Sequence, residues 1–384
     1  MSIVLPSNLP HEINAPSPIT LPDELIAEVL SLLNVKSLTQ LKCVSKSWNS
    51  IISDPIFVKI HLHKSSRNPH IILFPSDVIN NSVFVLPISL LQKPSFYFFN
   101  YESEYHSMKL PHRHRVIGSC NGLICLLNSR GNEFYLWNPA TNPFYENLGS
   151  FPLHFQYSNS FYKFSFGYDN LTDKYKLVTF SSKEVRVRVF TFGPNIWKNI
   201  PCFSIYPYDS ETNEGVYLNN TLNWFAFLNN NPYCYQNLNF EQFAIISLDL
   251  GTETYKEFPF PREFDEVPSF PPIVCVLMDC LCFSHYTKEH SFIIGQMKEF
   301  GVEKSWTKVL KFDFHSIFEC YKLVHLLPFY MFENGDILIL ERNAGQVIRY
   351  DRRDNRVVIK TIHTNNNIYL SSVVPYVESL VSTF

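Results

Sequence analysis

A strand–turn–strand unit that recurs beyond residue 130 constrains the fold of this 384-residue chain more than any other feature. In each copy an apolar run ends in an Asn or Asp (Asn138, Asp249 and Asp351), and a second polar residue follows three positions later. Such a side chain accepts hydrogen bonds from backbone N–H groups further along and stabilises a turn between strands. The turns start 111 and 102 residues apart, about two units of roughly 50 residues each, and a four-stranded unit of that size is typical of a β-propeller blade.

Counting such units along the chain gives the size of the predicted ring. Five follow one another, at 115–148, 163–201, 214–260, 273–313 and 325–362. Apolar runs at 70–110 and 371–379 make a sixth, and joining the first and last strands in one blade would close the ring and hide its edges. We therefore predict an all-β propeller of about six blades over residues 70–384, with five or seven blades or a pair of β-sandwiches as alternatives. The chain has no Gly-Gly and no Trp-Asp pair, which excludes a strict kelch repeat and a WD40 array.

The N-terminal part has a different period. Residues 1–19 contain four prolines and no periodicity, which predicts a flexible tail. From Thr20 onward apolar residues recur with helical spacing, and the pattern predicts three short helices over residues 20–62. We expect these helices to start near Thr20, Ser37 and Ser45, and the last to end at Asp54-Pro55. The chain thus belongs to the α+β multidomain class, with a small helical domain followed by a propeller.

The helical region carries more apolar surface than it can bury by itself. On the first helix Leu25, Val29 and Leu32 form one stripe, and Ile26 and Leu30 lie beside it. A unit of about 40 residues is marginal for a free-standing core. Two interpretations stay open on the pattern alone: a helical lid packed on the rest of the chain, or a docking surface for a partner.

Charge and cysteine usage narrow the classes of partner. Lys and Arg number 32 against 35 acidic residues, and a net charge of −3 argues against a protein that grips nucleic acid by its phosphates. The longest apolar stretch, 83–91, is interrupted by Pro87 and is too short to span a bilayer. Nine cysteines without a secretory signal pattern favour reduced thiols in the cytoplasm or nucleus. We therefore expect no nucleic-acid partner and no membrane partner.

Three side-chain clusters invite a chemical role, and each has a plainer explanation. The first combines cysteines with histidines: Cys275, Cys280, Cys282, His285 and His290. Their spacing is not that of a zinc site, and we expect core packing instead. The basic residues in 109–115 and the acidic pair Glu102 and Glu104 are expected to lie in solvated loops. No nucleophile elbow and no His-Glu-x-x-His motif occurs, so the sequence predicts no catalytic residue, no metal site and no cofactor.

Several strings resemble a known family. The stretches 21–33 (LPDELIAEVLSLL), 35–38, 42–48 (KCVSKSW) and 52–57 resemble an F-box motif. Downstream, 118–125, 136–141 and 166–178 resemble plant F-box proteins with a C-terminal F-box-associated interaction domain, the group that includes S-locus F-box and F-box/kelch proteins. Asn34 departs from the pattern, because the family usually has proline there. Asn also ends or caps helices, so we expect little damage.

The resemblance implies a substrate-recognition subunit of an SCF-type ubiquitin ligase, which is not itself an enzyme. The F-box would bind a Skp-type adaptor and through it the cullin and RING subunits, while the propeller would bind an unidentified target for ubiquitination and proteasomal degradation. The residues that this implies for the adaptor surface are Leu21, Pro22, Leu25, Ile26, Val29, Leu30, Val35, Leu38, Val44 and Trp48. Some of these are expected to pack inside the helical domain instead.

Other functions stay open beside the ligase receptor. The propeller could bind proteins outside any ligase, or it could be a hydrolase with its site at the channel mouth. The sequence does not identify the target, and the candidate recognition loops are 151–160, 205–214, 229–239 and 261–272. These segments are long and rich in Asn, Pro and aromatic residues, which is typical of recognition loops and of exposed loops in general.

Overall fold

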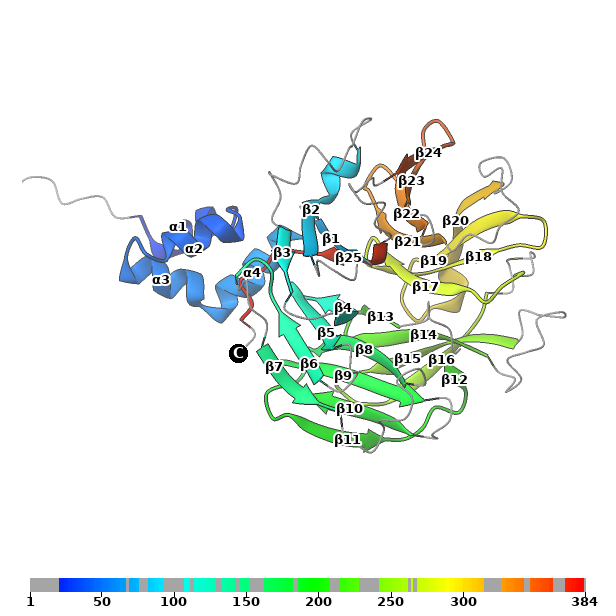
Figure 1. Ribbon diagram of the computed structural model, residues 1–384, viewed down its shortest axis with the longest axis horizontal. Helices are drawn as coiled ribbons and strands as arrows, with labels where there is room; N and C mark the ends of the chain where they lie inside the picture. Colours follow the sequence, from blue (N-terminus) through cyan, green and yellow to red (C-terminus); the bar gives the residue numbers. More distant parts are fainter. Residues whose placement is uncertain are drawn as a thin grey trace, which may run out of the picture.

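The computed structural model describes most of the chain. The described residues are 21–66, 69–75, 82–92, 107–110, 114–128, 133–141, 146–151, 162–181, 186–207, 215–227, 242–261, 264, 268–313, 326–341, 346–361 and 370–382. The predicted tail at 1–19 and the pair Glu102 and Glu104 lie outside them. Helices form the N-terminal part of the described chain, and β-sheets form nearly all of the rest (Figure 1).

Four helices, one more than the sequence predicted, form the N-terminal unit. They are α1 (Asp23–Leu30), α2 (Val35–Leu41), α3 (Lys46–Ser53) and α4 (Pro55–Ser65). The prediction is wrong at Pro55, which begins α4 and does not end the helical region. Proline suits this first position, because the N–H that it lacks would have no partner inside the helix. Asp54 caps α4, and its Oδ1 accepts from the N–H of Ile56 at 2.7 Å and that of Phe57 at 3.3 Å.

Side chains also set the starts of two earlier helices. Ser45 caps α3 as predicted, and its Oγ accepts from the N–H of Trp48 at 3.1 Å. The predicted start at Ser37 is wrong, because Asn34 caps α2 and its Oδ1 accepts from the N–H of Ser37 at 2.8 Å. Asparagine is among the strongest helix caps, so it serves well where the family has proline. The expected cap of α1 was Thr20, which lies outside the described residues, and this prediction is wrong because α1 begins at Asp23 with Pro22 in the cap position.

The β-region forms six sheets arranged as the blades of a ring, which confirms the predicted propeller (Figure 1). Blade 1 contains β1 (His70–Pro75), β2 (Ser82–Pro87), β3 (Ser107–Lys109) and β25 (Leu370–Tyr376). Blade 2 contains β4 (His114–Cys120), β5 (Leu123–Asn128), β6 (Glu133–Trp137) and β7 (Glu146–Ser150). Blade 3 contains β8 (Tyr162–Asp169), β9 (Lys174–Ser181), β10 (Val187–Thr191) and β11 (Ile196–Ile200).

The other half of the ring repeats the pattern. Blade 4 contains β12 (Tyr206–Pro207), β13 (Val216–Leu218), β14 (Thr221–Phe227), β15 (Phe243–Asp249) and β16 (Tyr255–Pro259). Blade 5 contains β17 (Ile273–Leu277), β18 (Cys280–Tyr286), β19 (Ser291–Met297) and β20 (Trp306–Asp313), and blade 6 contains β21 (Leu326–Met331), β22 (Ile337–Glu341), β23 (Gln346–Asp351) and β24 (Arg356–Thr361). Blade 4 has a fifth strand because β12 and β13 both pair with β14. Short 3-10 helices follow β2 (η1, Ile88–Gln92) and precede β20 (η7, Glu303–Ser305).

The two ends of the β-region close the ring, as predicted. β25 pairs with β1 in antiparallel register, with Ile72 opposite Val374. The sheet order β25-β1-β2-β3 makes the C-terminal strand the innermost of blade 1, where it lies beside β4 and β21 of the neighbouring blades. Closing the ring within one sheet ties the first and last strands of the propeller together.

The apolar cores lie between the blades. Each of six clusters of buried side chains joins two neighbouring blades. On β1, Ile71 and Leu73 pack toward blade 6, whereas Ile72 and Phe74 pack toward blade 2. Successive side chains of a strand point to opposite faces, and here both faces are covered. This is why the strands appear in the sequence as continuous apolar runs.

The recurring Asn and Asp turns have the predicted local role. Asp249 Oδ1 accepts from the N–H groups of Gly251 and Thr252, each at 2.8 Å. Asp351 Oδ1 accepts from the N–H of Arg353 at 3.0 Å, and Asn138 Oδ1 accepts from that of Ala140 at 3.0 Å. The local interpretation of these residues is therefore confirmed at all three positions.

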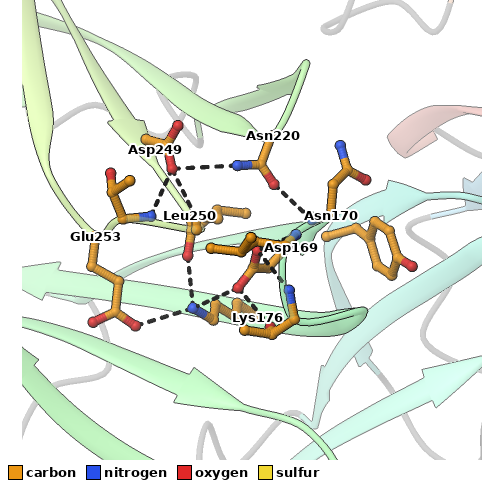
Figure 2. Close-up of polar contacts among 12 residues, drawn as sticks. Asp169, Asn170, Lys176, Asn220, Asp249, Leu250 and Glu253 are labelled. Atoms are coloured by element: carbon orange, nitrogen blue, oxygen red, sulfur yellow. Dashed lines mark hydrogen bonds and ion pairs between the residues drawn. The ribbon is translucent and has the colours of Figure 1, made fainter.

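A buried lysine joins the turns of blades 3 and 4 (Figure 2). Lys176 Nζ lies 3.0 Å from Asp169 Oδ2 in its own blade and 3.1 Å from Glu253 Oε1 in the next, and it donates to the Leu250 carbonyl at 2.6 Å. The Asp169 side chain is fully buried. Lys198, which is exposed, binds the other oxygen of Glu253 at 2.5 Å. We name these four charged side chains the inter-blade network.

The connections between strands divide the propeller into two faces. Because each blade is antiparallel, successive connections alternate between opposite ends of the strands. Tight turns such as 121–122, 170–173, 219–220 and 278–279 occupy one end, which we name the turn face. Strands β5, β14 and β20 end at the opposite side, at Asn128, Phe227 and Asp313, and we name this side the loop face. β25 ends and β1 begins at the turn face, so α4 and the segment 377–382 attach there.

Candidate functional site

An apolar stripe lies exposed along α1 and the turn after it. Leu21, Leu25, Val29 and Leu32 retain 59%, 53%, 61% and 71% of their accessible surface. At about 100° per residue Leu25 and Val29 lie about 40° apart on one side of α1, while Leu21 precedes the helix and Leu32 lies in the turn after it. We name this set the exposed stripe. Single exposed leucines are ordinary, but a contiguous row on a small domain indicates a contact surface.

The opposite side of α1 builds the core of the helical unit. Leu30 is 3% exposed and packs with Val35, Leu38, Ile52 and Phe57. The structure therefore corrects the assignment of Leu30, Val35 and Leu38 to the docking surface. Helical geometry is the reason for Leu30, which lies about 140° around the helix from Leu25.

The remaining candidates divide between surface and interior. Pro22 is exposed and Val44 is 62% exposed, so both stay available to a partner. Ile26 and Trp48 are half-buried and pack against the helical core with part of their surface. Of the ten candidates, the surface set is thus Leu21, Pro22, Leu25, Val29 and Val44, with Ile26 and Trp48 at its border.

The sequence interpretation missed several exposed apolar residues. Leu32 was placed in the stripe but not among the adaptor candidates, although it is the most exposed of the row, and Leu33 is 36% exposed. Ile56 and Ile60, one turn apart on α4, are 69% and 44% exposed. A fourth helix starting at Pro55 would have revealed these two as neighbours, because residues four apart share a helix face.

A buried histidine ties α4 to the end of the first helical segment. His61 is 1% exposed, and its Nε2 lies 2.9 Å from the Leu33 carbonyl. Burial lowers the pKa of His61, while the hydrogen bond to Leu33 and the nearby Glu378 act in the opposite direction. Lys64 Nζ bonds Glu28 at 2.6 Å and the Ser31 hydroxyl at 2.7 Å. These contacts hold α4 against α1, so the exposed stripe stands on a packed unit.

The cysteine, histidine and basic clusters noted in the sequence belong to strands and cores of the propeller where the structure describes them. Cys275 and Cys282 are cross-strand partners within the apolar core between blades 5 and 6, where burial raises the pKa of the Cys282 thiol well above its ordinary value. Cys120 and Cys125 are also buried. The expectation of a loop is wrong for Lys109, which ends β3, and for His114 and Arg115, which begin β4 and are half-buried. His112 and Arg113 lie outside the described residues. Across the described ranges no group of three His, Cys, Asp or Glu is placed to hold a metal ion.

The strands next to three of the four proposed recognition loops end on the same side of the molecule. The strands that flank 152–160, 229–239 and 261–272 end at the loop face, opposite the turn face that carries the helices. The fourth candidate, 205–214, interrupts the innermost strand of blade 4 between β12 and β13. Most residues of these loops lie outside the described part of the chain. In the described part, no helix has both the length and the apolar character needed to cross a bilayer.

The geometry defines a class of protein with two separate surfaces: a small helical unit with an exposed apolar stripe, and a closed six-bladed propeller. Comparison with family models identifies the family of both parts. Residues 19–60 match the F-box domain, and residues 71–383 match the F-box associated beta propeller domain. The chain therefore belongs to the family of F-box proteins with an F-box-associated propeller.

Curated relatives come from the same family. An F-box/kelch-repeat protein of Arabidopsis thaliana is 30% identical over 305 residues, which cover 77% of this chain and 80% of that protein. The F-box protein CPR1 of Arabidopsis thaliana is 24% identical over 387 residues, which cover 94% and 89%. Among solved structures, a chain of a nidogen–laminin complex is 10% identical with a TM-score of 0.46, over 81% of this chain and 99% of its own.

Proposed function

We propose that this protein is the substrate receptor of an SCF-type ubiquitin ligase. The observation that carries the proposal is the exposed stripe, which stands outward on a packed helical unit that matches the F-box domain. A lid packed on the propeller would bury this stripe, whereas Leu25 and Val29 remain more than half exposed. A Skp-type adaptor would cover the stripe and connect the chain to the cullin and RING subunits.

The loop face would bind the target protein. It lies opposite the helices, so a bound target and a bound adaptor would not compete for the same surface. The receptor then acts by proximity, because it holds the target near the activated ubiquitin and replaces a bimolecular encounter with a local concentration on the order of mM. This role requires no acid, base or nucleophile from the receptor, and we propose that the chain is not an enzyme.

Two narrower statements belong to the same proposal. The protein would be located in the cytoplasm or nucleus, where free cysteines such as the buried Cys120, Cys125 and Cys282 stay reduced. The motifs at 118–125, 136–141 and 166–178 support a relation to S-locus F-box proteins.

Adaptor capture tests the proposal. The double variant Leu25→Asp, Val29→Asp should weaken binding of a purified Skp-type adaptor by at least about 100-fold, because each carboxylate would be desolvated without a partner at several kcal/mol. Isothermal titration with the full-length chain measures the change. Ile196→Asp is the matched control, since Ile196 is 62% exposed on the outermost strand of blade 3.

The outcomes separate the proposal from its rivals. Loss of binding in the double variant, with the control unchanged and far-ultraviolet dichroism intact, supports the receptor. Unchanged adaptor capture by the double variant contradicts the stripe as the docking surface. A wild-type chain that captures no adaptor would indicate a propeller that binds proteins outside a ligase.

A further inference from the structure

The segment 377–382, which follows the last strand, lies between the helical unit and the propeller. We propose that this segment is a latch that fixes the F-box helices against the propeller, with Leu380 and Asn138 as its positioning residues. The inference rests on the proposed function, because the orientation so fixed is that of the adaptor surface relative to the target-binding face.

Leu380 anchors the latch in the helical unit. It is only 8% exposed and belongs to the same apolar cluster as Leu30, Leu38, Ile52 and Phe57. Ala140, from the turn between β6 and β7, packs against this cluster as well. The core of the F-box helices is therefore completed by residues from the far end of the chain and from blade 2.

Asn138 anchors the latch in the propeller. Its side chain is fully buried, and its Nδ2 donates to the carbonyls of Ser379 at 3.0 Å and Val381 at 2.8 Å. Its Oδ1 accepts from the Tyr376 hydroxyl at 3.1 Å, in addition to the local bond within its turn. One amide thus holds the segment on both sides of Leu380, and Val381 packs against the core between blades 2 and 3.

The turn before β5 is shaped to receive the latch. Gly122 has a φ of +78°, and a Cβ at this position would lie 2.7 Å from the Val377 carbonyl oxygen and against the Ser379 side chain. A glycine is required here on both counts, because other residues rarely adopt this φ and the space is already filled. Ser379 is itself fully buried.

Among the described residues, the other restraints on the helices are small. Residues 66–69 form the covalent link to β1, and Lys59 Nζ meets Asp173 of the β8–β9 turn at 3.1 Å with both side chains 67% exposed. An exposed ion pair of this kind contributes little. Domains joined by a short link and a small polar contact usually move relative to each other, so the latch is the element that restrains them.

A fixed orientation would determine which lysines the ligase can reach. In a reconstituted complex with a Skp-type adaptor, cullin and RING subunit, self-ubiquitination should therefore mark a restricted set of propeller lysines. If the latch is released, the helices reorient and more lysines should be marked. A residue that merely stabilised the propeller would not change this pattern once the protein is folded.

The test compares four full-length proteins. Leu380→Ser removes the apolar anchor, Leu380→Met conserves it, and Asn138→Asp removes the two amide donors while keeping the shape. Ile196→Ser is a surface control. Hydrogen exchange of the chain alone measures how firmly the latch is held, and adaptor titration measures whether the docking surface is intact. Mass spectrometry of the reconstituted ligase maps the lysines that carry ubiquitin.

We expect exchange at 377–382 and 138–141 to be about tenfold faster in Leu380→Ser and Asn138→Asp, with blades 4 and 5 unchanged and adaptor affinity within about twofold of wild type. The set of marked lysines should widen in these two variants and stay as in wild type for Leu380→Met and Ile196→Ser. If Leu380→Ser does not fold, the exchange and lysine patterns of Asn138→Asp decide whether the latch exists. Wild-type exchange and an unchanged lysine set in folded variants would overturn the latch. A wild-type chain that binds no adaptor would overturn the proposed function, while the exchange result would still decide whether the segment restrains the helices.

Discussion

Replacement of Lys176 by methionine should destabilise the propeller far more than the same replacement at Lys198. Both lysines bind Glu253, at 3.1 and 2.5 Å, but their surroundings differ. The Lys176 side chain is 6% exposed and also meets the buried Asp169, whereas that of Lys198 is 67% exposed. Methionine keeps the length and most of the apolar contacts of lysine while removing the charge and the donors.

The expected cost follows from what Lys176→Met leaves behind. Removing one partner of a buried ion pair costs about 3 to 5 kcal/mol, because the other charge stays buried and uncompensated. Asp169 retains the Leu171 N–H at 2.9 Å and the Thr172 hydroxyl at 2.6 Å, which places the cost near the lower end of this range. Lys198→Met removes only an exposed pair and should cost about 0 to 1 kcal/mol.

Equilibrium urea unfolding, followed by tryptophan fluorescence, measures the difference. Trp224 is a suitable reporter because it is fully buried in the core between blades 3 and 4, where the inter-blade network lies. With an m-value of about 3 kcal/mol/M or more, a loss of about 3 kcal/mol lowers the midpoint by up to roughly 1 M. Equal midpoints for the two variants would refute the reasoning, because burial would then make no difference to the pair.

Three further perturbations act on the helical unit and its junction. Burial lowers the pKa of His61, so the folded state favours the neutral imidazole. The stability that this preference contributes is complete above the unfolded pKa of about 6.5 and is lost as the pH falls below that value. Hydrogen exchange of α4 between pH 7.5 and 5.5 should show this loss, and His61→Gln should abolish the pH dependence. Asp54→Ala removes the cap of α4 and should cost about 1 kcal/mol, measured by urea unfolding against Ser53→Ala as control. Gly122→Ala places a methyl group against Ser379 at a φ of +78° and should lower the stability by more than about 1 kcal/mol in the same assay.

Much of the propeller follows from local rules that a sequence expresses directly. The strands are buried on both faces and therefore appear as apolar runs, and the turns between them carry Asn or Asp at positions such as 249 and 351 where a side chain bonds the backbone. The repeat of these two signals predicted the blade units. The closure by β25 was predicted instead from the apolar runs at the two ends of the β-region, which would otherwise leave sheet edges open. The helix starts were harder to predict, because Asn34 and Ser37 are both good caps three residues apart and only the packing of Val35 selects between them.

The docking surface was predictable in kind but not residue by residue. Leu25 and Leu30 are equally apolar, and both belong to the wide apolar side of the first helix. Only the position of α3 and α4 decides that Leu30 is covered and Leu25 is not. A periodic pattern states which residues share a helix face, whereas the choice of the buried face depends on which neighbours pack against the helix.

The contacts of Asn138 show where local reasoning ends. Its Oδ1 forms the turn that the sequence predicts, and this bond satisfies the usual explanation for an Asn after a strand. Its Nδ2 binds carbonyls 241 and 243 residues away, and no local pattern distinguishes Asn from Asp for the first task. Asp249 and Asp351 can form their turns with a carboxylate, but a carboxylate has no proton to donate to the latch. The identity of residue 138 as Asn is therefore explained by the long-range contact and not by the turn, whose Ala140 packs against the helical core. Asn138→Asp separates the two roles, because it should keep the turn and release the segment.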